Sequence, residues 1–230
     1  MFDEDKLGDQ RKSKSKSRRH HAEANYATIV EWGNGKPSER RRTKTREDII
    51  QAAHALITDH GLEGVSIRAV ADLTSYSPAA LYRYFEGKEQ LVDAVRAHCF
   101  EQLNAAILQA VMPLTNPTEQ LLAGGLTYIR YAREHPVDYH LMFYLPPSAA
   151  TQDDSHRTAM RALLFIVRNG IDSGMIRVSD AFDENAIVYQ CWATVHGLAM
   201  LQTTAMQDEQ TTFDAVCEPI LRKVIAGFSA

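Results

Sequence analysis

Residues 77–85 read SPAALYRYF. Ser77 is a residue type that caps helix N-termini, and Pro78 suits the first helical position, so the stretch predicts a short helix that runs to about Phe85. A glycine interrupts the pattern two residues later. Apolar residues then recur at helical spacing, which predicts a long helix over residues 88 to about 110.

Two further helices are predicted upstream of this stretch. The first starts near Thr45 and ends before Gly61, which suits a left-handed position after a helix. The second starts after the capping residue Ser66 and ends near Leu73, and residues 74–76 form a tight turn. The apolar stripes are Ile49, Ala53, Leu56 and Ile57 in the first helix and Ile67, Val70 and Ala71 in the second. The second and third helices form a helix-turn-helix, whose last helix presents its N-terminal side chains to the DNA major groove.

The rest of the chain keeps a helical period between proline, glycine and aspartate interruptions. No segment alternates apolar and polar residues as a half-buried strand does. We therefore predict an all-α fold. The helices are expected near residues 118–134, 137–145, 154–173, 181–206 and 211–228.

Composition limits the class of protein. The chain has 230 residues, of which 45% are hydrophobic and 23% charged, as is usual for soluble globular proteins. No apolar run approaches the ~20 residues that span a bilayer, and the acidic N-terminus lacks the order of a secretory signal. We expect a cytoplasmic protein. The three cysteines are far apart in the sequence, which argues against a disulfide framework.

Positive charge is concentrated at the N-terminus. Residues 1–46 hold 13 Lys and Arg against 7 Asp and Glu, although the whole chain has a net charge of −4. Such an asymmetric charge distribution indicates binding to nucleic acid. Residues 1–39 show no apolar periodicity and are predicted to be disordered. They could be a flexible arm that contacts phosphates or a solvated extension, and the sequence leaves both open.

The stretch from residue 44 to residue 95 resembles the tetracycline-repressor (TetR) family of transcriptional regulators. SPAALYRYF and the EGKEQL that follows it resemble the family's recognition-helix signature, and residues 49–61 and 66–71 resemble its first two helices. The sequence departs in the turn, where Ser75 and Tyr76 replace the usual Gly and Val. The resemblance implies a sequence-specific DNA-binding regulator that acts as a homodimer on a double-stranded operator and is released by a small molecule, most often as a repressor.

The candidate DNA contacts follow from this helix and its flanks. Ala79 and Ala80 allow close approach to the groove, and their methyls and the Pro78 ring can pack on thymine methyls. Arg83 can contact guanine, a phosphate or Glu86, and these alternatives stay open. Hydroxyl groups can bind phosphates, which is also the role that the resemblance implies for Tyr82. The complete candidate set is Thr45, Arg68, Ser77, Pro78, Ala79, Ala80, Tyr82, Arg83, Tyr84 and Lys88.

The C-terminal half carries weaker motifs. Trp192, His196 and Gly197 resemble the "WHG" subclass of TetR C-terminal domains, and so does His135–Pro136 with the aromatic residues that follow it. The resemblance implies a domain that dimerises and holds an effector. The candidate pocket residues are Tyr128, Tyr131, Met142, Phe143, Phe165, Trp192 and His196. Packing in the hydrophobic core explains each of these residues equally well. Gly197 lies inside a predicted helix, where glycine is unfavourable, and close approach of a second copy at a dimer interface would explain it.

Catalytic and metal-binding motifs are not found. No two His or Cys residues stand at i,i+3 or i,i+4 spacing, so we predict no metal site. P-loop, dinucleotide-binding, HExxH and nucleophile-elbow patterns are also lacking, so we predict no cofactor and no enzymatic activity.

Three regions are predicted in all. They are a disordered basic extension (1–39), a helix-turn-helix DNA-binding domain (40–90) and an α-helical ligand-binding and dimerisation domain (91–230). The alternative is a DNA-binding dimer whose C-terminal bundle serves only to dimerise and binds no effector.

Overall fold

The computed structural model describes residues 37–145, 155–205 and 210–230. They belong to two units that divide between Glu47 and Asp48. Most of the predicted basic extension (1–39) lies outside the described residues. The domain boundary expected after residue 90 stays a prediction.

The described residues form helices joined by turns and loops, with only two isolated β-bridges between single residue pairs. This confirms the predicted all-α class. The helices are α2 (Pro37–His60), α3 (Ile67–Thr74), α4 (Pro78–Leu81), α5 (Lys88–Val111), α6 (Pro117–Glu134), α7 (Pro136–Phe143), α8 (Ser155–Asp172), α9 (Glu184–Thr204) and α10 (Gln210–Ala226). None of the described helices is both long and apolar enough to cross a membrane.

Side-chain caps fix the helix-turn-helix as the sequence predicts. The Ser66 hydroxyl accepts a hydrogen bond from the Ala69 amide at 3.1 Å, at the start of α3. The Ser77 hydroxyl accepts one from the Ala80 amide at 3.2 Å, at the start of α4. Between them Ser75 is left-handed, with φ 59°, so the turn holds a residue without β-branching in a region that most L residues avoid.

Helix α2 begins at Pro37, earlier than the predicted start at Thr45. The residues in between are exposed and mostly Arg, Lys and Glu, so they form no apolar stripe. These residue types favour helix by intrinsic propensity, and proline suits the first position. The expectation of disorder was therefore wrong for residues 37–39.

Helix α4 ends at Leu81, earlier than the predicted end at Phe85. The amides of Arg83 and Tyr84 bond to carbonyls three residues back, at 3.2 and 2.9 Å, which tightens the chain after Leu81. This turn brings Phe85 into the core, where it is 2% exposed. The predicted helix was too long because burial of Phe85 requires a tighter path than a regular helix gives.

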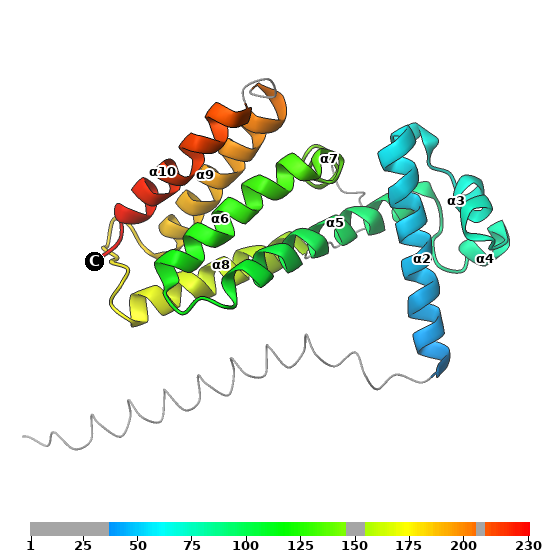
Figure 1. Ribbon diagram of the computed structural model, residues 1–230. Coiled ribbons are helices and arrows are strands. Elements are labelled where there is room, and N and C mark those ends of the chain that lie inside the picture. The colour runs from blue at the N-terminus through cyan, green and yellow to red at the C-terminus, as the bar shows by residue number, and fades with distance from the viewer. Residues whose placement is uncertain (1–36, 146–154, 206–209) are drawn as a thin grey trace, which may run out of the picture. The chain divides into compact units, whose positions relative to one another are not determined.

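Helix α6 is the centre of the C-terminal helices. It packs against α5 and α9 and also contacts α8 and α10 (Figure 1). One hydrophobic core runs without interruption from α2 to α9, since Ile49, Leu91, Tyr139 and Ala199 belong to the same cluster of buried residues. The helix-turn-helix and the C-terminal helices therefore share packed side chains.

Candidate functional site

The N-terminal end of α4 is an exposed surface of small residues. Pro78 and Ala79 are exposed and Ala80 is half-buried, while Leu81 behind them is fully buried. Tyr82 is 58% exposed. Because Pro78, Ala79 and Ala80 have short side chains, the first turn of the helix can approach another molecule closely.

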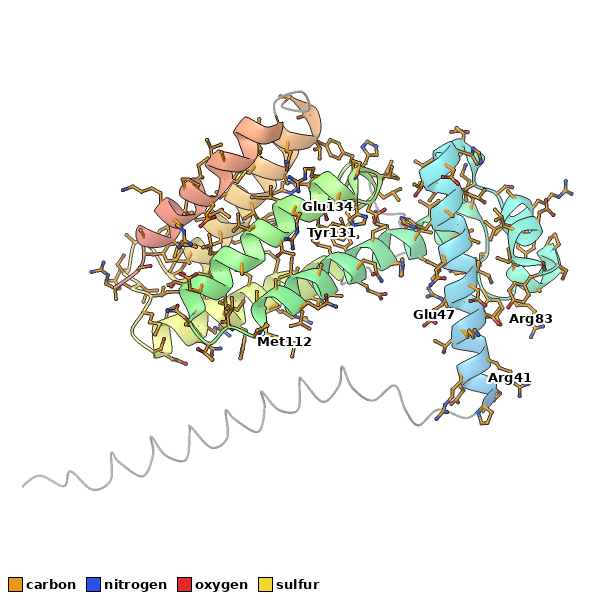
Figure 2. The ribbon with its side chains drawn as sticks, viewed as in Figure 1. Arg41, Glu47, Arg83, Met112, Tyr131 and Glu134 are labelled. Atoms are coloured by element: carbon orange, nitrogen blue, oxygen red, sulfur yellow. The ribbon has the colours of Figure 1, made fainter. Side chains whose placement is uncertain are left out.

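Arg83 lies on the turn after α4 and extends outward from it (Figure 2). Its side chain makes no hydrogen bond or ion pair with the described residues, and the backbone amide of Glu86 bonds to the Gln90 side chain at 2.7 Å. Of the alternatives that the sequence left open, pairing between Arg83 and Glu86 is therefore not the arrangement found. The guanidinium is available for an external partner.

The two tyrosines of the candidate DNA-contact set, Tyr82 and Tyr84, differ in burial. Tyr84 is half-buried and packs against the core, whereas Tyr82 is exposed. Tyr76, the bulky residue of the turn, also packs against the core, and its hydroxyl donates to Asp48 Oδ2 at 3.4 Å. This explains how a large residue is accommodated in the turn.

The flanking candidates lie at helix starts. Arg68 is exposed in the first turn of α3, and Lys88 is exposed at the first position of α5. Helix N-termini and basic side chains both favour phosphate oxygens. Thr45 is half-buried on α2 in the unit that ends at Glu47.

Several of the candidate pocket residues form an aromatic cluster inside the C-terminal helices. His196 Nδ1 lies 2.9 Å from the Tyr128 hydroxyl and 2.8 Å from the Tyr139 hydroxyl. The His196 ring also contacts Phe143 and Trp192, with centroids 4.7 and 5.5 Å away. Burial lowers the pKa of His196, so Nδ1 of a neutral ring can accept from the tyrosines.

His196 finds its hydrogen-bond partners within the protein, and Trp192 beside it is half-buried. Met142 is buried in the same core. Tyr139 also belongs to this cluster but is not among the predicted pocket residues, although it follows the His135–Pro136 motif. Phe165 on α8 was expected to line an apolar pocket, but its side chain is 40% exposed.

A separate cleft of about 460 Å³ opens among α2, α5, α6 and α7. Tyr131 is the one predicted pocket residue that lines it. Ten of its twelve lining residues have polar side chains, in contrast to the aromatic and apolar pocket that was expected. The lining residues are His54, His98, Gln102, Ala105, Ala106, Gln109, Thr127, Arg130, Tyr131, Glu134, His135 and Asp138.

Asp138 is a buried acid among the residues that line this cleft. Its carboxylate lies 2.5 Å from His54 Nε2 and accepts a hydrogen bond from the Tyr131 hydroxyl at 3.1 Å. The bond to Asp138 raises the pKa of His54. Burial by itself raises the pKa of Asp138, but the bonds from His54 and Tyr131 outweigh it and lower that pKa.

Neither His54 nor Asp138 is among the site residues predicted from the sequence. They lie 84 residues apart in the chain, so no spacing rule connects them. A partial signal existed, because a lone aspartate among the apolar residues of α7 needs partners if it is buried.

Two stretches of the chain match known protein families. Residues 49–95 match the family described as bacterial regulatory proteins, tetR family. Residues 121–224 match the tetracyclin repressor-like C-terminal domain. The chain belongs to the tetR family.

Individual HTH-type transcriptional regulators resemble the chain in sequence. An uncharacterized HTH-type transcriptional regulator of Mycobacterium tuberculosis is 24% identical over 183 residues, which are 80% of this chain and 81% of that protein. The HTH-type transcriptional repressor KstR of Mycolicibacterium smegmatis is 32% identical over 106 residues, 46% of each chain.

Solved structures share the fold. A protein of unknown function from Rhodococcus sp. RHA1 has a TM-score of 0.70 and 24% identity, and covers 87% of this chain and 99% of its own. A TetR family transcription regulator from Marinobacter aquaeolei VT8 has a TM-score of 0.60 and 22% identity, with 83% and 98% covered. This tetR-family protein is thus a DNA-binding transcriptional regulator with the helix-turn-helix at α3 and α4.

Lys88 offers a test of the phosphate contacts of this tetR-family protein. We expect Lys88→Gln to make the slope of log affinity against log salt shallower by about 0.9, because one phosphate contact is lost. Equilibrium binding to one DNA duplex over a salt series measures this slope. The matched control is Lys223→Gln on α10, which removes the same charge from another exposed site. Equal slopes for both variants would exclude Lys88 from the DNA contact.

Proposed function

We propose that this regulator binds its operator as a homodimer, represses transcription and releases the DNA when a small molecule binds the C-terminal helices. The exposed N-terminal surface of α4 carries the DNA-binding part of the proposal, with Ala79, Ala80 and Arg83 at the base edges. Tyr82, Arg68 and Lys88 contact phosphates on either side. Repression is proposed because the relative KstR of Mycolicibacterium smegmatis is a transcriptional repressor. A protein that acts on the chromosome in this way works in the cytoplasm.

The homodimer is proposed from exposed apolar residues on the last two helices. Tyr189 and Leu201 on α9 are 62% and 45% exposed, and Val216 and Ile220 on α10 are 43% and 37% exposed. Val216 and Ile220 stand i,i+4 and share one face of their helix. A methyl group at Gly197 would meet no atom within 4 Å among the described residues, which leaves room for close approach of a second copy.

The effector part of the proposal concerns the cleft, because the aromatic cluster is filled by its own contacts. A lining with Arg130, Glu134 and three histidines suits a polar or charged small molecule more than a hydrocarbon. The alternative, a dimer without an effector, is favoured by the internal hydrogen bonds of His196. Neither alternative involves catalysis.

Genomic DNA binding tests the first part of the proposal. The full chain is incubated with fragmented genomic DNA, and the retained fragments are sequenced. We expect enrichment of one nearly palindromic sequence whose half-sites lie about one DNA turn apart, ~34–36 Å or a multiple of it. Recovery of all fragments in proportion to their abundance would contradict sequence-specific binding.

Reciprocal titrations test the effector. A compound that raises the melting temperature of the protein is titrated with and without operator DNA, and the operator is titrated with and without the compound. We expect equal factors in the two directions, because linkage between two binding equilibria is reciprocal. A compound that binds the body but leaves operator affinity unchanged favours the dimer without an effector.

A further inference from the structure

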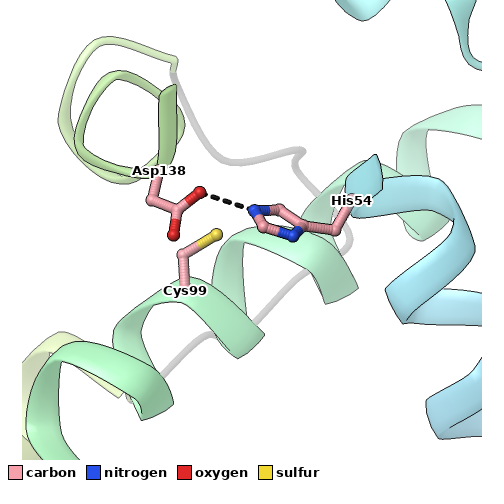
Figure 3. A group of neighbouring side chains, drawn as sticks. All are labelled: His54, Cys99 and Asp138. Atoms are coloured by element: carbon pink, nitrogen blue, oxygen red, sulfur yellow. Dashed lines mark hydrogen bonds and ion pairs between the residues drawn. The ribbon is translucent and has the colours of Figure 1, made fainter. Parts of the chain in front are cut away.

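Three potential metal ligands from different helices meet next to the cleft. His54 lies on α2, Cys99 on α5 and Asp138 on α7 (Figure 3). A nitrogen, the sulfur and a carboxylate oxygen of these residues all lie within 4.8 Å of one another. The Cys99 residue is 1% exposed, and the side chains of Asp138 and His54 are 8% and 30% exposed. No other such group occurs among the residues that the structure describes.

The three ligand types select a class of metal ion. Imidazole, thiolate and carboxylate together suit Zn²⁺ and its neighbours among the divalent transition metals, and are a poor set for Mg²⁺ or Ca²⁺. In a tetrahedral zinc site the bonds are ~2.0–2.3 Å, which places ligand atoms roughly 3.4–3.7 Å apart. The spacing of the ligand atoms of His54, Cys99 and Asp138 is close to this range. Binding requires His54 and Asp138, now 2.5 Å apart, to separate by about 1 Å.

The charges of the site balance when a divalent ion is bound. The ion replaces the proton of the Cys99 thiol, and this proton leaves to solvent. It also replaces the proton between His54 Nε2 and Asp138. A protonated ring releases this proton to solvent, whereas a neutral ring carries its proton on Nδ1 instead. Cys99 and Asp138 then carry two negative charges against the two positive charges of the ion, while His54 is neutral. A site without net charge avoids most of the cost of burying ions.

The surroundings supply access and a second layer of contacts. His54 and Asp138 line the cleft, so an ion can enter from solvent. The Tyr131 hydroxyl bonds to Asp138 Oδ2 and orients the carboxylate, as outer contacts of metal sites do. His135 Nδ1 lies 3.9 Å from the same oxygen and is the nearest candidate for a fourth ligand.

We propose that His54, Cys99 and Asp138 bind one divalent transition-metal ion of the zinc class, with the fourth position directed to the cleft. The ion links α2, just before the helix-turn-helix, to α5 and α7. Bound metal therefore changes DNA affinity by favouring one arrangement of these helices. This consequence rests on the proposed function, whereas metal binding itself does not. The prediction of no metal site considered only ligands within one helix.

Cobalt titration tests the site, because Co²⁺ substitutes for Zn²⁺ and its bond to a thiolate gives a charge-transfer absorption band. The reduced, untagged full chain is titrated with Co²⁺ in the absence of DNA. We expect one Co²⁺ per chain with this band, and Zn²⁺ displaces it. Cys99→Ser abolishes the band, while Cys191→Ser and Cys217→Ser retain it. Tyr131→Phe lowers Co²⁺ affinity about 10–100-fold, as is typical of outer contacts.

Two results would overturn the proposal. One is a wild-type protein without a thiolate band at excess Co²⁺, and the other is a band that persists in Cys99→Ser. Circular dichroism checks that each variant is folded. If Cys99→Ser does not fold, His54→Ala replaces it, since His54 is partly exposed, and an undiminished Co²⁺ affinity in that variant overturns the proposal. Operator affinity with and without Zn²⁺ is measured separately, so failure of DNA binding is distinguished from failure of metal binding.

Discussion

Replacing Ala79 by Asp is expected to abolish operator binding while leaving the fold intact. Ala79 is exposed in the first turn of α4, where a carboxylate would meet both the bases and the phosphates at close range. Like-charge contacts in an interface cost several kcal/mol, so affinity should fall about 100-fold or more. Equilibrium binding of a labelled operator measures the loss.

The control for Ala79→Asp is Ala162→Asp on α8, an exposed alanine of another helix that receives the same charge. This variant should bind the operator nearly as the wild type does, because its carboxylate lies on a helix outside the proposed contact. Circular dichroism should be native for both variants. Wild-type affinity of a folded Ala79→Asp for every DNA tested would contradict the placement of α4 in the groove.

Replacing Phe85 by Ala is expected to destabilise the protein by about 3–5 kcal/mol, the usual cost of removing a buried phenylalanine side chain. Phe85 is 2% exposed and belongs to the core cluster that also holds Leu81 and Leu91. The loss should be seen as a lower free energy of unfolding in urea. DNA binding should weaken as well, because Phe85 fixes the turn after α4.

Tyr82→Ala is the companion to Phe85→Ala, since it removes a nearby ring that is 58% exposed. Its unfolding free energy should stay within about 0.5 kcal/mol of the wild type, whereas its affinity for all DNA sequences should fall through a lost phosphate contact. The two variants thus separate folding from binding. If Phe85→Ala lowers the unfolding free energy as little as Tyr82→Ala is expected to, Phe85 does not anchor the core as its burial indicates.

The C-terminal helices and the helix-turn-helix share one packed core, through which a helix shift in one part can affect the other. Ile49 of α2, Leu91 of α5 and Tyr139 of α7 are buried in one cluster. Packed interiors resist gradual deformation, so a ligand that shifts one helix favours a discrete rearrangement of its neighbours. Both the cleft and the proposed metal site lie against these helices, which places any regulatory ligand close to the core that α4 shares.

The sequence by itself determined the local structure of this protein. Ser66 and Ser77 are capping residues, and the left-handed Ser75 lies where a turn was expected, because caps and turns depend on residues within four positions of each other. The ranges of the later helices follow from the spacing of their apolar residues. Where no apolar stripe exists, as at the start of α2, the same method failed.

Only the tertiary structure decided which buried side chains meet. Helical periodicity indicates that Tyr128 and His196 face a core, but not that they hydrogen-bond to each other and with Tyr139. His54 and Asp138 lie on helices that are far apart in the sequence. Both residues line the cleft, and with Cys99 they form the candidate metal site. The physical reason is that burial is set by the period of one helix, whereas a contact depends on how two helices pack, which involves residues far apart in the chain.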